Sequence, residues 1–200
     1  MFAVLFTTVT LNAQDKSYLG LHKNRFMTNI FVSGGYATGL SDMNNFLSSK
    51  STFVGNFDDM QMLYGGFGFG INNFWNNSWS YYIGIEARRG NDLAAADNLH
   101  ASMDSWNGKI GAEYFFYQNN KVTLSANLCV GVEEINFAYG QYTGEWRNYT
   151  LPVGCTFWYK NIGFNINYSP AVFRTEPNET LIDMPKMSNN SIDLTVRFAF

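Results

Sequence analysis

Hydrophobic and polar residues alternate along most of the chain with a period of two, which is the pattern of β-strands that carry one apolar face. The final segment shows this most clearly, because every second residue is apolar: Ile192, Leu194, Val196, Phe198 and Phe200. We place eight such segments at residues 26–37, 61–72, 79–90, 106–117, 122–133, 149–159, 162–173 and 191–200. Each is close to the roughly ten residues that a tilted strand needs to cross a bilayer. The pattern therefore predicts eight membrane-crossing strands.

The connections between these segments alternate between short and long. Short links fall at residues 73–78, 118–121 and 160–161, and longer polar stretches at residues 38–60, 91–105, 136–148 and 174–190. The short links are rich in Asn and Lys, as tight turns between antiparallel strands are. Short turns at one end and long loops at the other are typical of bacterial outer-membrane barrels, whose termini lie on the periplasmic, short-turn side. We therefore expect both termini in the periplasm and the long loops outside the cell.

The volume of the side chains decides which face of each strand points outward. Aromatic residues make up 18% of the chain and charged residues only 14%, against a typical charged fraction of roughly 25%. The inside of an eight-stranded barrel holds few large side chains. The apolar face carries many of them: Phe67, Phe69, Trp79, Tyr81, Trp106, Tyr114, Phe116, Tyr149, Phe157, Tyr159, Phe164, Tyr168, Phe198 and Phe200. The sequence thus predicts an all-β fold, an eight-stranded antiparallel up-and-down transmembrane β-barrel with its apolar face toward lipid.

Aromatic residues also gather near the expected strand ends, where amphipathic rings favour the membrane interface. We expect a periplasmic girdle of Phe74, Trp75, Trp79, Phe116, Tyr117, Tyr159 and Phe200. We expect an outer girdle of Tyr36, Trp106, Tyr139, Trp146, Tyr149 and Phe173.

Charged residues occupy the inward positions of several strands. They are Glu86, Arg88, Lys109, Glu113, Glu133, Asp193 and Arg197. A hydrated arrangement of these charges would make a narrow, porin-like channel. Buried charges must be paired, however, and eight strands leave little free bore. We therefore favour a hydrogen-bonded charge network that fills the lumen.

The start of the chain has the apolar core of a secretory signal peptide, followed by a small residue at Ala13. We expect residues 1–13 to be this signal peptide, with a few residues missing before Met1 because no Lys or Arg precedes the apolar core. Residues 14–25 would be a periplasmic segment, and residues 26–200 the barrel. A net charge of −3 provides no basic surface for nucleic acid.

The two cysteines lack the spacing of a metal or redox pair, and the sequence indicates neither a metal site nor a cofactor. Cys129 lies on the polar face of its strand and Cys155 on the lipid face of the next. A plain hairpin that pairs Phe137 with Arg147 would instead set the cysteines opposite each other. We therefore expect a β-bulge at residues 133–134, which moves later side chains to the other face, and no disulfide.

Two short segments resemble known outer-membrane barrels. The alternating residues 192–200, which end in Phe200, resemble the C-terminal assembly signal of these proteins, and residues 149–154, with Pro152, resemble a strand of PorT-like barrel domains. The resemblance covers residues 26–200 and implies a small Gram-negative barrel of the OmpA/OmpX type. It further implies contact with outer-membrane lipid and lipopolysaccharide, and recognition of Phe198 and Phe200 by the assembly machinery.

A second resemblance points to an enzyme. His100, Ser102 and Glu113 resemble the His-x-Ser and Glu of lipid A deacylase barrels, in which Ser attacks, His is the base and the carboxylate orients it. Met103 stands where that family has Asn. The leading hypothesis is instead a non-enzymatic outer-membrane barrel whose surface loops bind an unknown extracellular ligand or serve a structural role. A lipid A-modifying hydrolase and a narrow channel are the alternatives.

Overall fold

A computed structural model of the chain describes residues 26–38, 40–49, 61–93, 101–140, 142–174 and 190–200. Residues 1–25, which hold the expected signal peptide and periplasmic segment, and His100 lie outside this part. The elements are β1 (Phe26–Thr38), α2 (Ser41–Ser49), β2 (Met62–Phe74), β3 (Trp79–Asp92), β4 (Ala101–Gln118), β5 (Val122–Tyr139), β6 (Tyr142–Thr150), β7 (Val153–Tyr159), β8 (Ile162–Ser169), β9 (Ala171–Arg174) and β10 (Asn190–Ala199). Within the described ranges, no helix is long and apolar enough to span a membrane.

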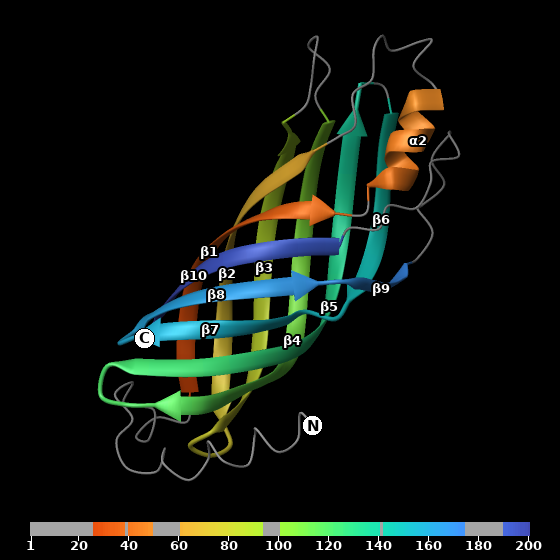
Figure 1. Cartoon of the computed structure of the whole chain (residues 1–200). Helices are drawn as coiled ribbons and strands as arrows, with labels where there is room; N and C mark the ends of the chain where they lie inside the picture. The colour runs from red at the N-terminus through yellow and green to blue at the C-terminus, as the bar shows by residue number, and fades with distance from the viewer. Residues whose placement is uncertain (1–25, 39, 50–60, 94–100, 141, 175–189) are drawn as a thin grey trace, which may run out of the picture.

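The strands form one closed antiparallel barrel (Figure 1). Strand β1 pairs with β2 on one side and with β10 on the other, and β4 pairs with β5 to complete the circle. The strands β6 and β7 form one crossing that is interrupted at Pro152, and β8 and β9 form another that is interrupted at Pro170. Proline lacks an N–H donor and therefore breaks the hydrogen-bond ladder. The prediction of eight antiparallel crossings is confirmed.

The tight turns lie at one end of the barrel, which we call the turn end; the opposite end is the loop end. Figure 1 shows the C-terminus near the turns and α2 at the opposite end. The Asn76 side chain accepts hydrogen bonds from the N–H groups of Ser78 and Trp79, at 2.8 and 2.9 Å. In the next turn, Asn119 likewise caps Lys121 and Val122. Side-chain bonds of this kind explain why Asn marks the short links in the sequence.

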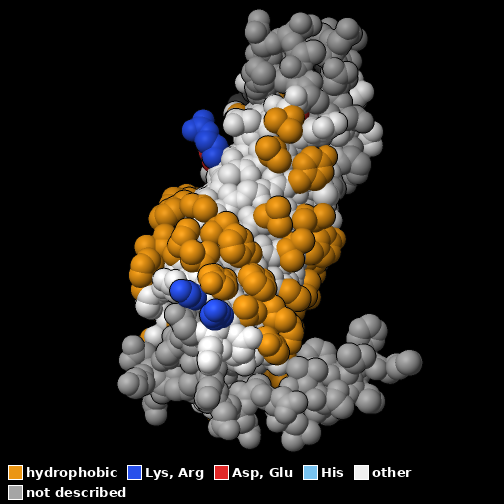
Figure 2. Space-filling view, turned by 60° about the vertical axis from the view of Figure 1, so that its left-hand side comes forward, with side chains coloured by type: hydrophobic (Ala, Val, Ile, Leu, Met, Phe, Trp, Pro, Cys, Tyr) orange, Lys and Arg blue, Asp and Glu red, His pale blue; other side chains and the backbone are white. Residues whose placement is uncertain are grey.

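The outer surface of the barrel carries a broad apolar band, part of which is visible in Figure 2. Phe67 is 59% exposed, Ile110 55% and Leu194 64%. The aromatic residues that the sequence assigns to the outer face are all exposed or half-buried. Small and polar side chains, by contrast, fill much of the interior. Soluble proteins rarely expose apolar patches of this extent, so the outer wall suits contact with lipid.

The predicted long loop at residues 136–148 is wrong. Strands β5 and β6 continue through this stretch to a tight turn, in which Gly140 adopts a positive φ of 57°. The alternation continues with the strands, and it turns Tyr139 and Trp146 into the barrel, where each is at most 5% exposed. These two residues therefore do not belong to the outer aromatic girdle.

These inward aromatic residues belong to an apolar cluster that we call the loop-end core. It consists of Ala37, Leu40, Met43, Met62, Tyr64, Ala101, Met103, Ile135, Phe137, Tyr139 and Trp146, with Phe46 packed against it. Leu40, Met43 and Phe46 come from α2 and the residue before it, so the helix covers the barrel at this end. The barrel thus carries at its loop end a hydrophobic core of the kind found in soluble domains.

The predicted bulge at residues 133–134 is also wrong. Strand β5 keeps one register with β6 and β7, with Phe137 opposite Gly144 and Ala126 opposite Cys155. The irregularity lies instead in β4, between Phe115 and Tyr117. Cys129 is buried and Cys155 is exposed, as predicted, but the reason is the position of the β5–β6 turn rather than an inserted residue.

Candidate functional site

The seven charged residues singled out in the sequence all lie on the inner face of the barrel wall. The structure divides them into two groups along the lumen. Glu86, Arg88, Lys109, Glu133 and Asp193 form the Arg88 cluster, nearer the loop end. Glu113 and Arg197 form the Arg197 cluster, nearer the turn end.

The Arg88 cluster is organised around one guanidinium group. Arg88 Nη2 lies 2.9 Å from Glu86 Oε2 and 3.2 Å from Asp193 Oδ2, and Arg88 Nη1 lies 3.5 Å from Glu133 Oε1. Lys109 Nζ reaches the same Glu86 carboxylate at 3.5 Å. The guanidinium carbon also lies 4.9 Å from the centre of the Tyr64 ring, which connects this cluster to the loop-end core. Arginine suits such a position because its planar fork donates to several carboxylates at once.

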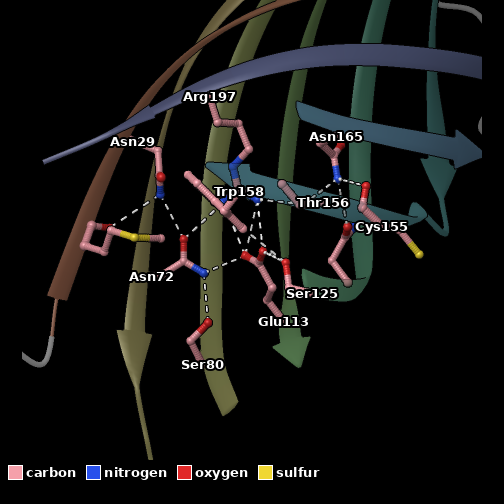
Figure 3. Close-up of polar contacts among 12 residues, drawn as sticks. Asn29, Asn72, Ser80, Glu113, Ser125, Cys155, Thr156, Trp158, Asn165 and Arg197 are labelled. Atoms are coloured by element: carbon pink, nitrogen blue, oxygen red, sulfur yellow. Dashed lines mark hydrogen bonds and ion pairs between the residues drawn. The ribbon is translucent and has the colours of Figure 1, made fainter. Parts of the chain in front are cut away.

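The Arg197 cluster ties together strands that lie far apart in the sequence (Figure 3). Arg197 Nη1 lies 3.2 Å from Glu113 Oε1, and Arg197 Nη2 donates to Asn72 Oδ1 at 3.1 Å. Asn72 Nδ2 in turn donates to Glu113 Oε2 at 2.8 Å, and Ser125 Oγ donates to Glu113 Oε1 at 2.6 Å. The Trp158 ring faces the guanidinium carbon at 4.9 Å. A buried charge pair with this many additional hydrogen bonds meets the conditions under which it can be stable.

Sequence reasoning missed the neutral members of these clusters. Asn72 and Ser125 are fully buried and bond Glu113 directly. Both lie at inward positions of their strands, so the alternation could have placed them inside, but not next to one particular carboxylate.

Apolar side chains close the lumen beyond the Arg197 cluster as well. Met27, Phe115, Trp158 and Ala199 form the turn-end core, with Phe74 packed against it. The centres of the Phe74 and Phe115 rings are 5.3 Å apart. Phe74 therefore packs against the interior instead of joining the periplasmic girdle expected from the sequence.

Little free space remains between the two charged clusters. A cavity lined by Phe31, Tyr82, Lys109, Glu113 and Arg197, among others, has a volume of about 20 Å³. A water molecule needs roughly 10–15 Å³ on this measure, so the cavity has room for about one. From loop end to turn end, the lumen thus holds an apolar core, the Arg88 cluster, a water-sized cavity, the Arg197 cluster and a second apolar core.

The residues of the hypothetical catalytic triad do not come together. Ser102 and Glu113 are eleven residues apart on β4, which at about 3.3 Å per residue separates them by roughly 35 Å. Glu113 is buried and occupied by Arg197, whereas Ser102 lies near the loop end. His100 lies outside the described residues. The geometry contradicts a triad that contains both Ser102 and Glu113.

Outward-facing ion pairs border the apolar band toward the loop end. Arg89 Nε lies 3.7 Å from Asp104 Oδ1, and the Arg147 guanidinium pairs with Glu134. Trp106 lies beside these pairs, opposite Glu134 in the sheet, and is 59% exposed. Charges next to an exposed Trp are typical of the level at which a membrane-spanning wall meets lipid headgroups.

The C-terminal strand closes the barrel and presents its last aromatic residues outward. Phe200 donates its backbone N–H to Thr28 at 2.9 Å, which pins the end of the chain to β1. Phe198 is 39% exposed and Phe200 75% exposed. Both rings are therefore accessible on the outer wall at the turn end.

The fold resembles solved barrels. Neisserial surface protein A (NspA) matches with 12% sequence identity over 88% of this chain and 98% of that chain, at a TM-score of 0.51. Two further structures match at 12% identity: Ail, the attachment invasion locus protein of Yersinia pestis, in complex with the heparin analogue sucrose octasulfate (88% of this chain, 97% of that chain, TM-score 0.49), and the N-terminal β-barrel domain of Pseudomonas aeruginosa OprF (87% and 97%, TM-score 0.42).

No protein-family model matches the chain, and no curated protein matches it in sequence. At 12% identity, the likeness to NspA establishes the fold of the chain but not its activity. The function has to be argued from this chain's own residues.

Proposed function

We propose that this chain is a non-conducting, non-enzymatic outer-membrane barrel that displays a rigid binding or structural surface outside the cell. In this proposal the turn end faces the periplasm and the loop end faces outward. The apolar band on the outer wall carries the proposal, because a wall with exposed side chains such as Phe67, Ile110 and Leu194 requires lipid around it.

The content of the lumen supports a closed barrel over a channel. Ion conduction needs a continuous hydrated path, whereas this lumen holds two apolar cores and a cavity of about 20 Å³. The inward charges also bond one another across the lumen instead of lining an open bore. They serve as internal ties of the wall.

The loop-end core supports a role for the loop end as a platform. Strands β4, β5 and β6 continue beyond the outward ion pairs, and α2 packs Met43 against them with no exposed surface. A scaffold that is packed in this way holds the segments it connects in fixed positions, and binding residues commonly lie on such segments. Lipopolysaccharide, an unidentified extracellular ligand and the assembly machinery, through Phe198 and Phe200, are the partners in this proposal.

Cysteine labelling of intact cells tests location and sidedness together. In a variant with both native cysteines replaced by serine, Thr143→Cys places a thiol at the loop end and Asn120→Cys places one in an exposed turn. A membrane-impermeant maleimide should label Thr143→Cys in intact cells and Asn120→Cys only after lysis. The reverse pattern would contradict the orientation, and recovery of the protein in a salt-washed soluble fraction would contradict the membrane location.

Planar-bilayer recordings test the closed lumen. The purified protein should add no steady conductance above that of a protein-free bilayer. Regular, protein-dependent current steps would favour the channel instead.

A further inference from the structure

The outer wall of the barrel carries an apolar hollow of about 820 Å³. It spans strands β2 to β6 and reaches β9. The outward side chains that line it are mostly branched aliphatic or aromatic, and include Ile85, Ile110, Val130, Val132, Tyr149 and Leu151. This volume lies within the range of about 300–1,000 Å³ typical of small-molecule pockets, and it leaves room for a hydrocarbon chain.

A missing side chain at Gly108 lies at the centre of this hollow. The strand registers place Ile85, Gly108, Val132 and Tyr149 side by side across four strands. Each neighbour in this row projects a bulky outward side chain, whereas Gly108 projects none. A Cβ atom built on Gly108 would meet no atom within 4 Å. The row therefore has a gap, with apolar walls on both sides.

The hollow lies directly below the outward ion pair at the border of the apolar band. The next row toward the loop end contains Trp106, Glu134 and Arg147, in register across β4, β5 and β6. Tyr149 lines the hollow two residues below Arg147. A polar rim with aromatic residues above an apolar recess matches the order of headgroup and hydrocarbon in a bilayer leaflet.

We infer that this hollow is a binding site for one hydrocarbon chain of a membrane lipid, whose polar head lies beside Trp106 and the Glu134–Arg147 pair. This inference rests on the proposed membrane location of the barrel. The apolar lining and the position below the rim select a lipid chain over a polar ligand. A second copy related by a twofold axis would set one concave wall against another and leave the recess unfilled.

Native mass spectrometry with matched glycine variants tests the site. The wild type, Gly108→Phe, Gly108→Leu and Gly65→Phe are reconstituted into dioleoylphosphatidylethanolamine/dioleoylphosphatidylglycerol vesicles and extracted in detergent. Gly65 is the control because it also faces outward into open space but lies outside the hollow. A Cβ atom built on Gly65 would lie 3.9 Å from the nearest atom. Heat-dependent gel mobility of every variant reports whether the barrel has folded.

The wild type and Gly65→Phe should each retain one phospholipid per chain. Both Gly108 variants should retain it about tenfold less, which is the effect of losing contact with roughly two methylene groups. Equal retention by all four proteins, or equal loss from Gly65→Phe, would overturn the site while leaving the membrane barrel intact. A dimer in place of bound lipid, lost only in the Gly108 variants, would overturn the lipid assignment. A wild type without heat-dependent mobility would instead contradict the proposed function itself.

Discussion

The guanidinium of Arg197 on β10 bonds the carboxylate of Glu113 on β4 across the lumen, with Nη1 3.2 Å from Oε1. Both side chains are at most 7% exposed. The two strands lie on different sides of the barrel and are not neighbours in the sheet. The pair therefore forms only when the wall has closed, and it links closure of the barrel to the pairing of two buried charges.

Replacing Arg197 by Met should destabilise the barrel strongly. The change leaves Glu113 as an uncompensated buried charge, which typically costs about 3–5 kcal/mol. Urea unfolding in lipid vesicles, followed by heat-dependent gel mobility, measures the free energy of unfolding.

Two further variants separate this effect from loss of charge in general. Arg89→Met removes an exposed partner of Asp104 and should change the stability by only about 0–1 kcal/mol. Adding Glu113→Gln to Arg197→Met should recover part of the loss, since no buried charge then remains unpaired. If Arg197→Met were as stable as Arg89→Met, the Arg197 cluster would not stabilise the fold.

Substitutions in the Arg88 cluster should follow the number of carboxylates that each base contacts. Arg88 reaches Glu86, Glu133 and Asp193, whereas Lys109 is paired with Glu86 alone. Lys109→Met should therefore destabilise the barrel, and Arg88→Met should do so more. The same unfolding assay gives the ranking, and a larger effect at Lys109 would mean that Arg88 is not the centre of the cluster.

The period of two predicts the strands, the faces and the short turns because each depends on local sequence. Asn76 and Asn119 cap their own turns, and the inward side of every strand follows from its parity. The contacts between the charges are not predictable in this way. Asn72 meets Glu113 and Arg197 only through the closure and stagger of three strands.

The loop-end extension escapes prediction because it breaks the rule used to find strand ends. The interior of a small membrane barrel is expected to be polar, so the inward apolar residues Ile135, Phe137 and Trp146 suggest a bulge, a loop or a girdle. In the structure they pack against α2, whose sequence has too few apolar residues to predict a helix. A second, soluble-type core inside the same wall explains all three errors.

The cysteines should remain unpaired in an oxidising compartment. Cys129 donates its backbone N–H to Pro152 at 2.9 Å, and Cys155 lies opposite Ala126, so the two thiols occupy opposite faces of the wall. A small lipid-soluble thiol reagent should label Cys155 in membranes, and a bulky polar maleimide should label neither thiol. A disulfide between Cys129 and Cys155 in protein from unreduced membranes would show that one of the two strands has the wrong face inward.

Replacing Phe137 by Ala should loosen the loop end without opening the barrel. Phe137 is 2% exposed, and its ring centre lies 6.0 Å from that of Trp146 within the core that α2 covers. Truncation of a buried Phe costs about 3–5 kcal/mol, and here the cost falls on the packing of the loop end, because the charged clusters and the turn-end core are untouched. Hydrogen exchange at the α2 backbone, where Asn44 donates to Leu40 at 2.9 Å, should accelerate by at least about tenfold. Phe69→Ala removes an outward ring of the lipid-facing wall and should leave this exchange unchanged. Equal acceleration in both variants would mean that α2 responds to the barrel as a whole, and the loop end would then not be a separately packed platform.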